Sequence, residues 1–259
     1  MSRTVLYEQD DHRNLLLAAV SAGEGVDTNQ HLIIDGHEAL LLDPGGAKLY
    51  SRVATLVSRE RERYEAELKY VFLSHQDPDV VASVNGWLMT TGATGLISTL
   101  WKRFMPHFGC DKLVYSRLEG VPDEGMVIRL GSRELVLLPA HFLHSVGNLH
   151  LYDPTSKVLY TGDLGVSLGE DGREVEDFDA HVSHMRGFHE RYMTNTGALR
   201  GWLKMARTLD VEIVAPQHGA LFRGRPMVLR LFDWLETLEC GYDRMKDVYR
   251  VPTGFAAPR

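Results

Sequence analysis

The sequence has few cysteines and no long apolar run. Cys110 and Cys240 are its only cysteines, they form no CxxC pair, and two cysteines cannot build the disulfide framework of a small secreted domain. We expect both to be buried apolar residues. Apolar runs such as LLLAAV (15–20) are far shorter than the ~20 residues that span a bilayer. The first residues, MSRTVLYEQDDHRN, lack the apolar core of a signal peptide. We therefore expect a cytoplasmic protein without a membrane segment.

The chain also lacks an excess of positive charge. It has 28 Lys and Arg residues against 35 Asp and Glu residues, a net charge of −7. A nucleic-acid surface needs a basic face, so nucleic acid is not the expected partner. The hydrophobic share of 44% is ordinary for a globular protein.

No repeat and no Pro/Gly/Ser-rich linker divides the sequence, so we expect a single domain over residues 1–259. Short apolar runs typical of strands fill the first third and return after about residue 125. Amphipathic runs with helical spacing lie between them, and a long C-terminal helix is expected at about 226–250. This order of elements predicts an α/β fold in which two sheets pack face to face with helices outside.

Polar residues follow four of the predicted strands directly. VFLS is followed by His75, Asp77 and Asp79, and VLLPA by His141 and His144. Asp163 follows VLYTG, and His218 follows VEIVAPQ. Loops beyond strand ends are where α/β scaffolds place ligands and catalysts.

Each of these residues also has a purely structural interpretation. A single histidine at a strand end is commonly a hydrogen-bonded surface residue, Asp163 fits a turn, and Asp79 fits the cap of a helix that begins near Val80. The set of four strand ends is harder to explain in this way. Imidazole and carboxylate are ligands of hard and borderline metals, so the set predicts a metal site.

The same residues, in the same order, carry a resemblance to a known family. HxDxD at 75–79, His144, TGD at 161–163 and APQHG at 215–219 resemble the metallo-β-lactamase superfamily over about residues 15–225. This resemblance implies an αββα sandwich with two mixed sheets, helices on the outside and a two-metal site at one edge.

The first motif places the resemblance within the superfamily. Zinc hydrolases carry HxHxDH, whereas Asp77 puts a carboxylate at the third position, as in the HxExDH motif of flavodiiron proteins. The resemblance implies that His75, Asp77 and His144 hold one iron, that Asp79 and His218 hold the other, and that Asp163 bridges them. Imidazole and carboxylate suit iron or manganese, and zinc also accepts them.

Two positions depart from the flavodiiron pattern. Asp77 is one methylene shorter than the usual glutamate, and Val80 stands where a histidine would bind the second metal. With PAHFLHSVGN (139–148) and APQHGALFRG (215–224), the sequence is most similar to the oxygen-binding diiron proteins. We expect dioxygen to bind at the position that Val80 leaves open, for oxygen sensing or signalling.

Flavodiiron proteins continue into a flavodoxin domain, and no Gly/Ser/Thr-rich phosphate loop for a flavin is present here. We therefore expect no flavin and, if electrons are needed, a separate redox donor. The alternatives are an oxygen or nitric oxide reductase that uses such a donor, a zinc-dependent hydrolase, and a non-catalytic module that binds a signalling protein. The family resemblance also implies a homodimer.

Several further residues lie near these motifs. Asp43 in DPGG is expected to hydrogen-bond to the backbone beneath the site rather than to bind metal. His141 is either a support for the ligands or structural. His181, His184 and His189 form a helical cluster without an obvious carboxylate, so we expect this segment to cover the pocket or to form a subunit contact.

Overall fold

The first sheet of the protein forms from the N-terminal half of the chain. The structure is a computed structural model that describes residues 3–17, 26–169 and 174–254. Seven strands lie in chain order in this sheet: β1 (Arg3–Gln9), β2 (His12–Leu17), β3 (Gln30–Asp35), β4 (Glu38–Leu42), β5 (Glu67–Phe72), β6 (Thr94–Ser98) and β7 (Leu118–Val121). β1 to β4 pair antiparallel, and β4 to β7 pair parallel.

Helices connect the parallel strands, because a parallel pair cannot be joined by a tight turn. They are η1 (Ala47–Leu49) and α1 (Tyr50–Arg63), then α2 (Pro78–Val81) and α3 (Val84–Thr90), then α4 (Thr99–Lys102), η2 (Met105–Phe108) and α5 (Lys112–Tyr115). The helix that the sequence predicts to begin near Val80 is therefore two short helices. Ala82 and Ser83 separate them.

The second sheet forms from the C-terminal half. Its six strands have the order β13-β12-β11-β10-β9-β8, with β8 (Met126–Leu130), β9 (Arg133–Pro139), β10 (Leu149–Asp153), β11 (Val158–Tyr160), β12 (Ile213–Ala215) and β13 (Phe222–Arg223). β11 and β12 are parallel, and the connection between them contains α6 (Phe178–Tyr192) and α7 (Thr196–Ala206). α8 (Arg225–Thr237), α9 (Tyr242–Met245) and η3 (Lys246–Val248) follow.

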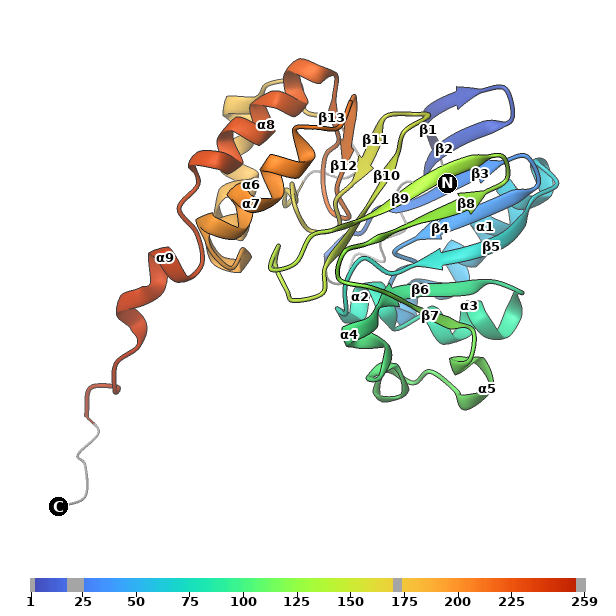
Figure 1. Ribbon diagram of the computed structural model, residues 1–259, viewed down its shortest axis with the longest axis horizontal. Coiled ribbons are helices and arrows are strands. Elements are labelled where there is room, and N and C mark those ends of the chain that lie inside the picture. The colour runs from blue at the N-terminus through green and yellow to red at the C-terminus, as the bar shows by residue number, and fades with distance from the viewer. Residues whose placement is uncertain (1–2, 18–25, 170–173, 255–259) are drawn as a thin grey trace.

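Three apolar clusters hold these layers together. One contains side chains from both sheets, such as Ile33 and Leu40 of the first and Leu137 and Leu151 of the second. The other two lie on the outer faces, where helices cover each sheet (Figure 1). The expected αββα sandwich of two mixed sheets is confirmed.

The predicted C-terminal helix at about 226–250 is wrong in its extent. α8 ends at Thr237, Leu238 is extended, and Gly241 has a φ of 52°. Gly241 donates its N–H to Glu190 O at 2.9 Å, and Tyr242 donates to Thr194 O at 2.8 Å. These bonds to the end of α6 and to the turn that follows it replace helical hydrogen bonds. The chain therefore leaves the helix and continues away from the body of the protein (Figure 1).

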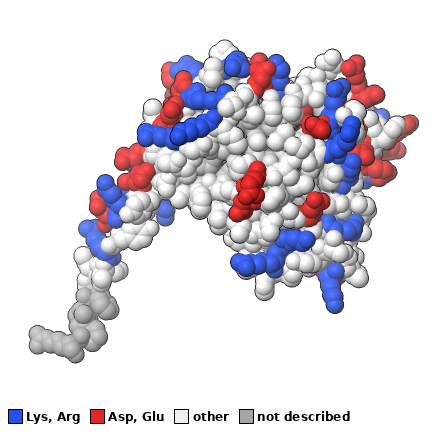
Figure 2. Space-filling model, in the orientation of Figure 1, with Lys and Arg blue, Asp and Glu red and all other residues white. Residues whose placement is uncertain are grey.

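Parts of three sequence predictions lie outside the described residues. They are the end of NLLLAAV (14–20), which predicts a strand, most of SAGEGVDTN (21–29), which predicts a turn, and residues 170–173 of the polar, acidic stretch SLGEDGREVEDFD (167–179). In the described part of the chain, no helix is both long and apolar enough to pass through a membrane. On the face shown in Figure 2, Lys and Arg side chains are interspersed with Asp and Glu.

A buried polar network joins the two sheets away from the strand ends that carry the candidate ligands. The His12 ring on β2 lies 3.0 Å from Asp35 Oδ1 through Nδ1 and 2.7 Å from Asp153 Oδ2 through Nε2. Asn14 Nδ2 also donates to Asp153 Oδ2 at 2.8 Å. The His12 side chain is fully buried, and it is the partner that both carboxylates share.

We expect His12→Ala to lower the free energy of unfolding by about 3 kcal/mol, because it leaves two buried carboxylates without their shared partner. Urea denaturation monitored by circular dichroism measures this loss. The exposed His37, whose ring bonds only to Glu65 O at 2.9 Å, provides the control. His37→Ala should change stability by less than about 0.5 kcal/mol. Equal losses in the two variants would show that the network does not stabilise the fold.

Candidate metal centre

Asp43 holds the start of the loop after β5 through hydrogen bonds to Ser74. Its carboxylate accepts the Ser74 N–H through Oδ1 and the Ser74 hydroxyl through Oδ2, both at 2.8 Å. The expectation that Asp43 hydrogen-bonds beneath the site is confirmed. Burial raises the pKa of Asp43 to about 6, although His75 and the two Ser74 hydrogen bonds oppose this effect.

The Ser74 hydroxyl also determines which nitrogen of His75 is free. Because this hydroxyl donates its hydrogen to Asp43, it accepts a hydrogen bond from the His75 Nδ1–H group, 2.9 Å away. The lone pair of His75 then lies on Nε2, which points toward Asp77 and Asp163. Such an arrangement, with one ring nitrogen tied and the other free, is typical of metal-binding histidines.

The β9–β10 loop carries His144 and is tied down on both sides. His141 Nε2 donates to Asp123 O at 2.8 Å, and Gly147 N donates to His141 Nδ1 at 3.1 Å. Of the two roles expected for His141, the structure therefore favours the structural one. The Ser145 hydroxyl donates to Gln76 Oε1 at 2.6 Å, which joins this loop to the loop that carries His75.

Asp163 and His218 come from the ends of β11 and β12. His218 Nδ1 donates to Asp27 O at 2.7 Å, so Nε2 is the nitrogen that carries the lone pair when the ring is neutral. The segment after Asp163 is held by His189 of α6, whose Nε2 accepts from Gly165 N at 2.9 Å and whose Nδ1 donates to Met185 O at 2.9 Å. Burial lowers the pKa of His189 to about 4, so this histidine is neutral.

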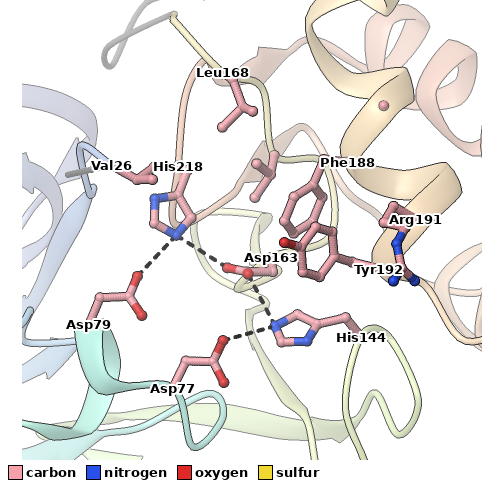
Figure 3. Close-up of a pocket in the computed structure, with 12 residues that line it drawn as sticks. Val26, Asp77, Asp79, His144, Asp163, Leu168, Phe188, Arg191, Tyr192 and His218 are labelled. Atoms are coloured by element: carbon pink, nitrogen blue, oxygen red, sulfur yellow. Dashed lines mark ion pairs between the residues drawn. The ribbon is translucent and has the colours of Figure 1, made fainter.

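All six candidate ligands converge, and Asp163 lies between two groups of them. Figure 3 shows Asp77, Asp79, His144, Asp163 and His218. Asp163 Oδ2 lies 3.1 Å from His144 Nε2 and 3.9 Å from His75 Nε2. Asp163 Oδ1 faces the other way and lies 3.5 Å from His218 Nε2.

The remaining two carboxylates divide in the same way. Asp77 Oδ2 lies 3.6 Å from His144 Nε2, whereas Asp79 Oδ2 lies 3.2 Å from His218 Nε2. These distances place the residues in the two groups that the family resemblance implies, whereas their assignment as metal ligands stays a prediction.

The electrostatics of this cluster follow from three buried or half-buried carboxylates beside three imidazoles. Burial opposes the charge on His218, but Asp79 and Asp163 outweigh it and raise the pKa of His218 to about 9. Burial also opposes the charge on Asp163, yet the neighbouring imidazoles hold the pKa of this carboxyl well below its usual range.

Three buried atoms of the cluster make no hydrogen bond with well-formed geometry in the described part of the protein: His75 Nε2, His144 Nε2 and Asp163 Oδ1. A buried polar atom without a partner is costly, and these three face the common centre. His75, Asp77, His144 and Asp163 each offer a ligand atom, and all four atoms lie within 4.8 Å of one another. The donor set therefore fits metal ions.

A cavity of about 570 Å³ opens over the cluster. Five of the candidate ligands line this cavity. It is also lined by side chains that the sequence analysis did not identify: Val26, Val166, Leu168, Phe188, Arg191 and Tyr192. The last three belong to α6, so the expectation that this segment covers the pocket is confirmed. His181 and His184 instead line a separate cavity beside Glu174.

Val80 lies elsewhere. Its side chain is fully buried in the apolar cluster between the first sheet and its helices, and it is not among the described residues that line the cavity. Whether a position left by Val80 is open to a ligand stays a prediction.

The fold and this cluster define a protein of the metallo-β-lactamase type with a candidate two-metal centre. The family described as "ODP family beta lactamase" matches residues 26–219, and the chain belongs to this family. The chain is similar to the chemotaxis sensor ODP in a structure of its peroxy diiron species, with 38% identity, a TM-score of 0.85, and coverage of 96% of this chain and 100% of that one.

The apo structure of the chemotaxis sensor ODP from T. denticola is also similar, with 38% identity, a TM-score of 0.82, and coverage of 96% and 99% of the two chains. Rubredoxin oxygen:oxidoreductase from Desulfovibrio gigas shares the fold, with 15% identity, a TM-score of 0.73, and coverage of 93% and 62%. An uncharacterised protein of Methanocaldococcus jannaschii is 22% identical over 208 residues, which cover 77% of this chain. The chain spans about half the length of that curated relative.

We expect His218 in metal-free protein to titrate near pH 9, well above the ordinary histidine pKa of about 6.5. Because the pKa is raised on folding, this proton stabilises the metal-free protein below about pH 6.5, and the stabilisation is lost as the pH rises through about 9. NMR of the imidazole after chelator treatment measures the value. Asp79→Asn should lower it. An ordinary pKa for His218 in the unsubstituted protein would contradict the electrostatic account.

Proposed function

We propose that this protein is a non-haem diiron protein that binds dioxygen and serves oxygen sensing. The observation that carries the proposal is the position of the Asp163 carboxylate, which directs one oxygen to each of two groups of ligands. In this proposal, His75, Asp77 and His144 hold one iron, Asp79 and His218 hold the other, and Asp163 bridges them.

The composition of this ligand set supports iron. Three carboxylates and three imidazoles form a mixed oxygen and nitrogen environment, which suits iron or manganese, and zinc remains chemically compatible. Similarity to the chemotaxis sensor ODP, which forms a peroxy diiron species, supports iron over the other two metals. Two ferrous ions would supply the electrons that dioxygen accepts when it binds.

The protein's own residues prepare the centre in three ways. Hydrogen bonds to Nδ1 of His75 and His218 orient the two rings with Nε2 toward the ions. Gln217 Nε2 donates to Asp79 Oδ2 at 3.1 Å and restricts that carboxylate. Apart from the bridge, only Asp79 and His218 are proposed for the second iron, which leaves room for dioxygen on the side of the cavity.

The sensing part of the proposal has separate support. The similar protein is a chemotaxis sensor. This similarity supports oxygen sensing over continued reduction of dioxygen. A single domain, a homodimer, and a separate signalling or redox protein complete the proposal as predictions.

The test is anaerobic reconstitution with ferrous iron followed by admission of oxygen. We expect two irons per chain by elemental analysis and a new visible absorption band after oxygen is added. Asp163→Asn keeps the size of the side chain but removes its charge, and it should bind fewer than two irons and lose the band.

His37→Ala, which changes an exposed histidine outside the cluster, should retain both the iron and the band. Wild-type protein with two bound irons and no oxygen-dependent band would refute oxygen binding. An Asp163→Asn variant that keeps two irons would refute the bridge.

A further inference from the structure

The cavity over the candidate centre is much larger than dioxygen requires. Its volume is about 570 Å³, whereas one water molecule occupies about 30 Å³ of liquid and dioxygen is of comparable size. Cavities of roughly 300–1,000 Å³ with mostly apolar walls are typical of sites for small organic molecules. The size and lining of the cavity therefore call for an explanation beyond access of oxygen to the metals.

One wall of the cavity is an aromatic surface on α6. The Phe188 and Tyr192 rings are stacked, with centroids 4.7 Å apart and an interplanar angle of 15°. Each also meets the His144 ring edge-on at 6.3 Å. Leu168, above this pair in Figure 3, also lines the cavity, so a flat apolar group there would meet apolar side chains from α6 and from the segment after Asp163.

An arginine accompanies these apolar walls. Arg191 lines the cavity beside Tyr192 and is exposed. Within the described part of the chain, it makes no ion pair or hydrogen bond, since its neighbour Glu190 pairs with Arg186 at 3.3 Å and with Arg244 at 3.2 Å. Its guanidinium is therefore available to a ligand and can form the paired hydrogen bonds that carboxylates accept.

We propose that this cavity binds a small organic anion, a carboxylate on a flat apolar body, with the carboxylate on Arg191 and the body against the Phe188–Tyr192 wall and the other apolar side chains of the lining. Such a ligand would lie over the side of the centre from which dioxygen approaches. Binding would therefore slow the reaction with oxygen and make the sensor respond to a metabolite as well. This regulatory consequence rests on the proposed oxygen binding, whereas the ligand site itself does not.

The choice of an organic carboxylate over a bare anion follows from the walls. An inorganic anion such as phosphate would lose hydration against Val166, Leu168 and Phe188 without gaining contacts there. An apolar body gains from the same surfaces by removing them from water. Benzoate combines both features and is small enough for the cavity, so it serves as the probe.

The experiment is calorimetric titration of benzoate into the iron-loaded full chain under anaerobic conditions. We expect saturable binding, with benzamide, which has the same shape without the charge, and inorganic phosphate both weaker. Arg191→Gln should weaken benzoate binding about tenfold or more, because it removes a charged pair of hydrogen bonds. Arg186→Gln, on the same helix but outside the cavity, should bind benzoate like the wild type.

Each other outcome overturns the inference. Absence of benzoate binding, or equal binding of benzamide, removes the anion site. If phosphate binds as tightly as benzoate, the apolar body of the ligand does not contribute to binding. Unchanged binding in Arg191→Gln shows that benzoate contacts only the metals.

After oxygen is admitted, benzoate should slow the rise of the visible band in the wild type but not in Arg191→Gln. If benzoate binds as expected but leaves this rate unchanged, the regulatory part fails. If no band forms in any sample, the proposed oxygen binding fails while the ligand site stands.

Discussion

The shared carboxylate of Asp163 is the constraint on which the site depends. It follows β11, its two oxygens face opposite groups of ligands, and its charge balances three imidazoles within 4 Å. A carboxylate that is buried in this way is stable only where cations surround it. Without metal, the proton that His218 holds up to about pH 9 contributes this compensation. Bound metal ions would supply this positive charge at every pH, because His75 Nε2, His144 Nε2 and Asp163 Oδ1 already face the centre without hydrogen-bond partners in the described part of the chain.

The two packed sheets position the residues around this carboxylate. Apolar strands bring Ser74, Asp163 and His218 to one edge, and hydrogen bonds then fix the details. Asp43 orients Ser74, Ser74 orients His75, and α6 holds the segment after Asp163 through His189. The same helix presents Phe188, Arg191 and Tyr192 to the cavity. α6 therefore links the geometry of the candidate ligands to the shape of the space above them.

The sandwich and the six clustered residues could be predicted because each depends on local order in the chain: an apolar run followed directly by His or Asp. Asp43 was predicted for the same reason. The end of α8 could not be predicted, because Gly241 leaves the helix to bond with Glu190, which is distant in sequence. Arg191 and Tyr192 were missed because helical periodicity does not show which face of α6 covers the site. For Val80, the sequence motif predicted a place beside the second metal. The motif could not show that the Val80 side chain is packed in the apolar core.

The most direct test of the central claim is an anomalous difference map from crystals of the iron-loaded protein, with data collected on both sides of the iron absorption edge. The account predicts two peaks per chain, one on each side of the Asp163 carboxylate. One peak should be contacted by His75, Asp77 and His144, and the other by Asp79 and His218. A single peak, or a peak that does not contact Asp163, would contradict the account.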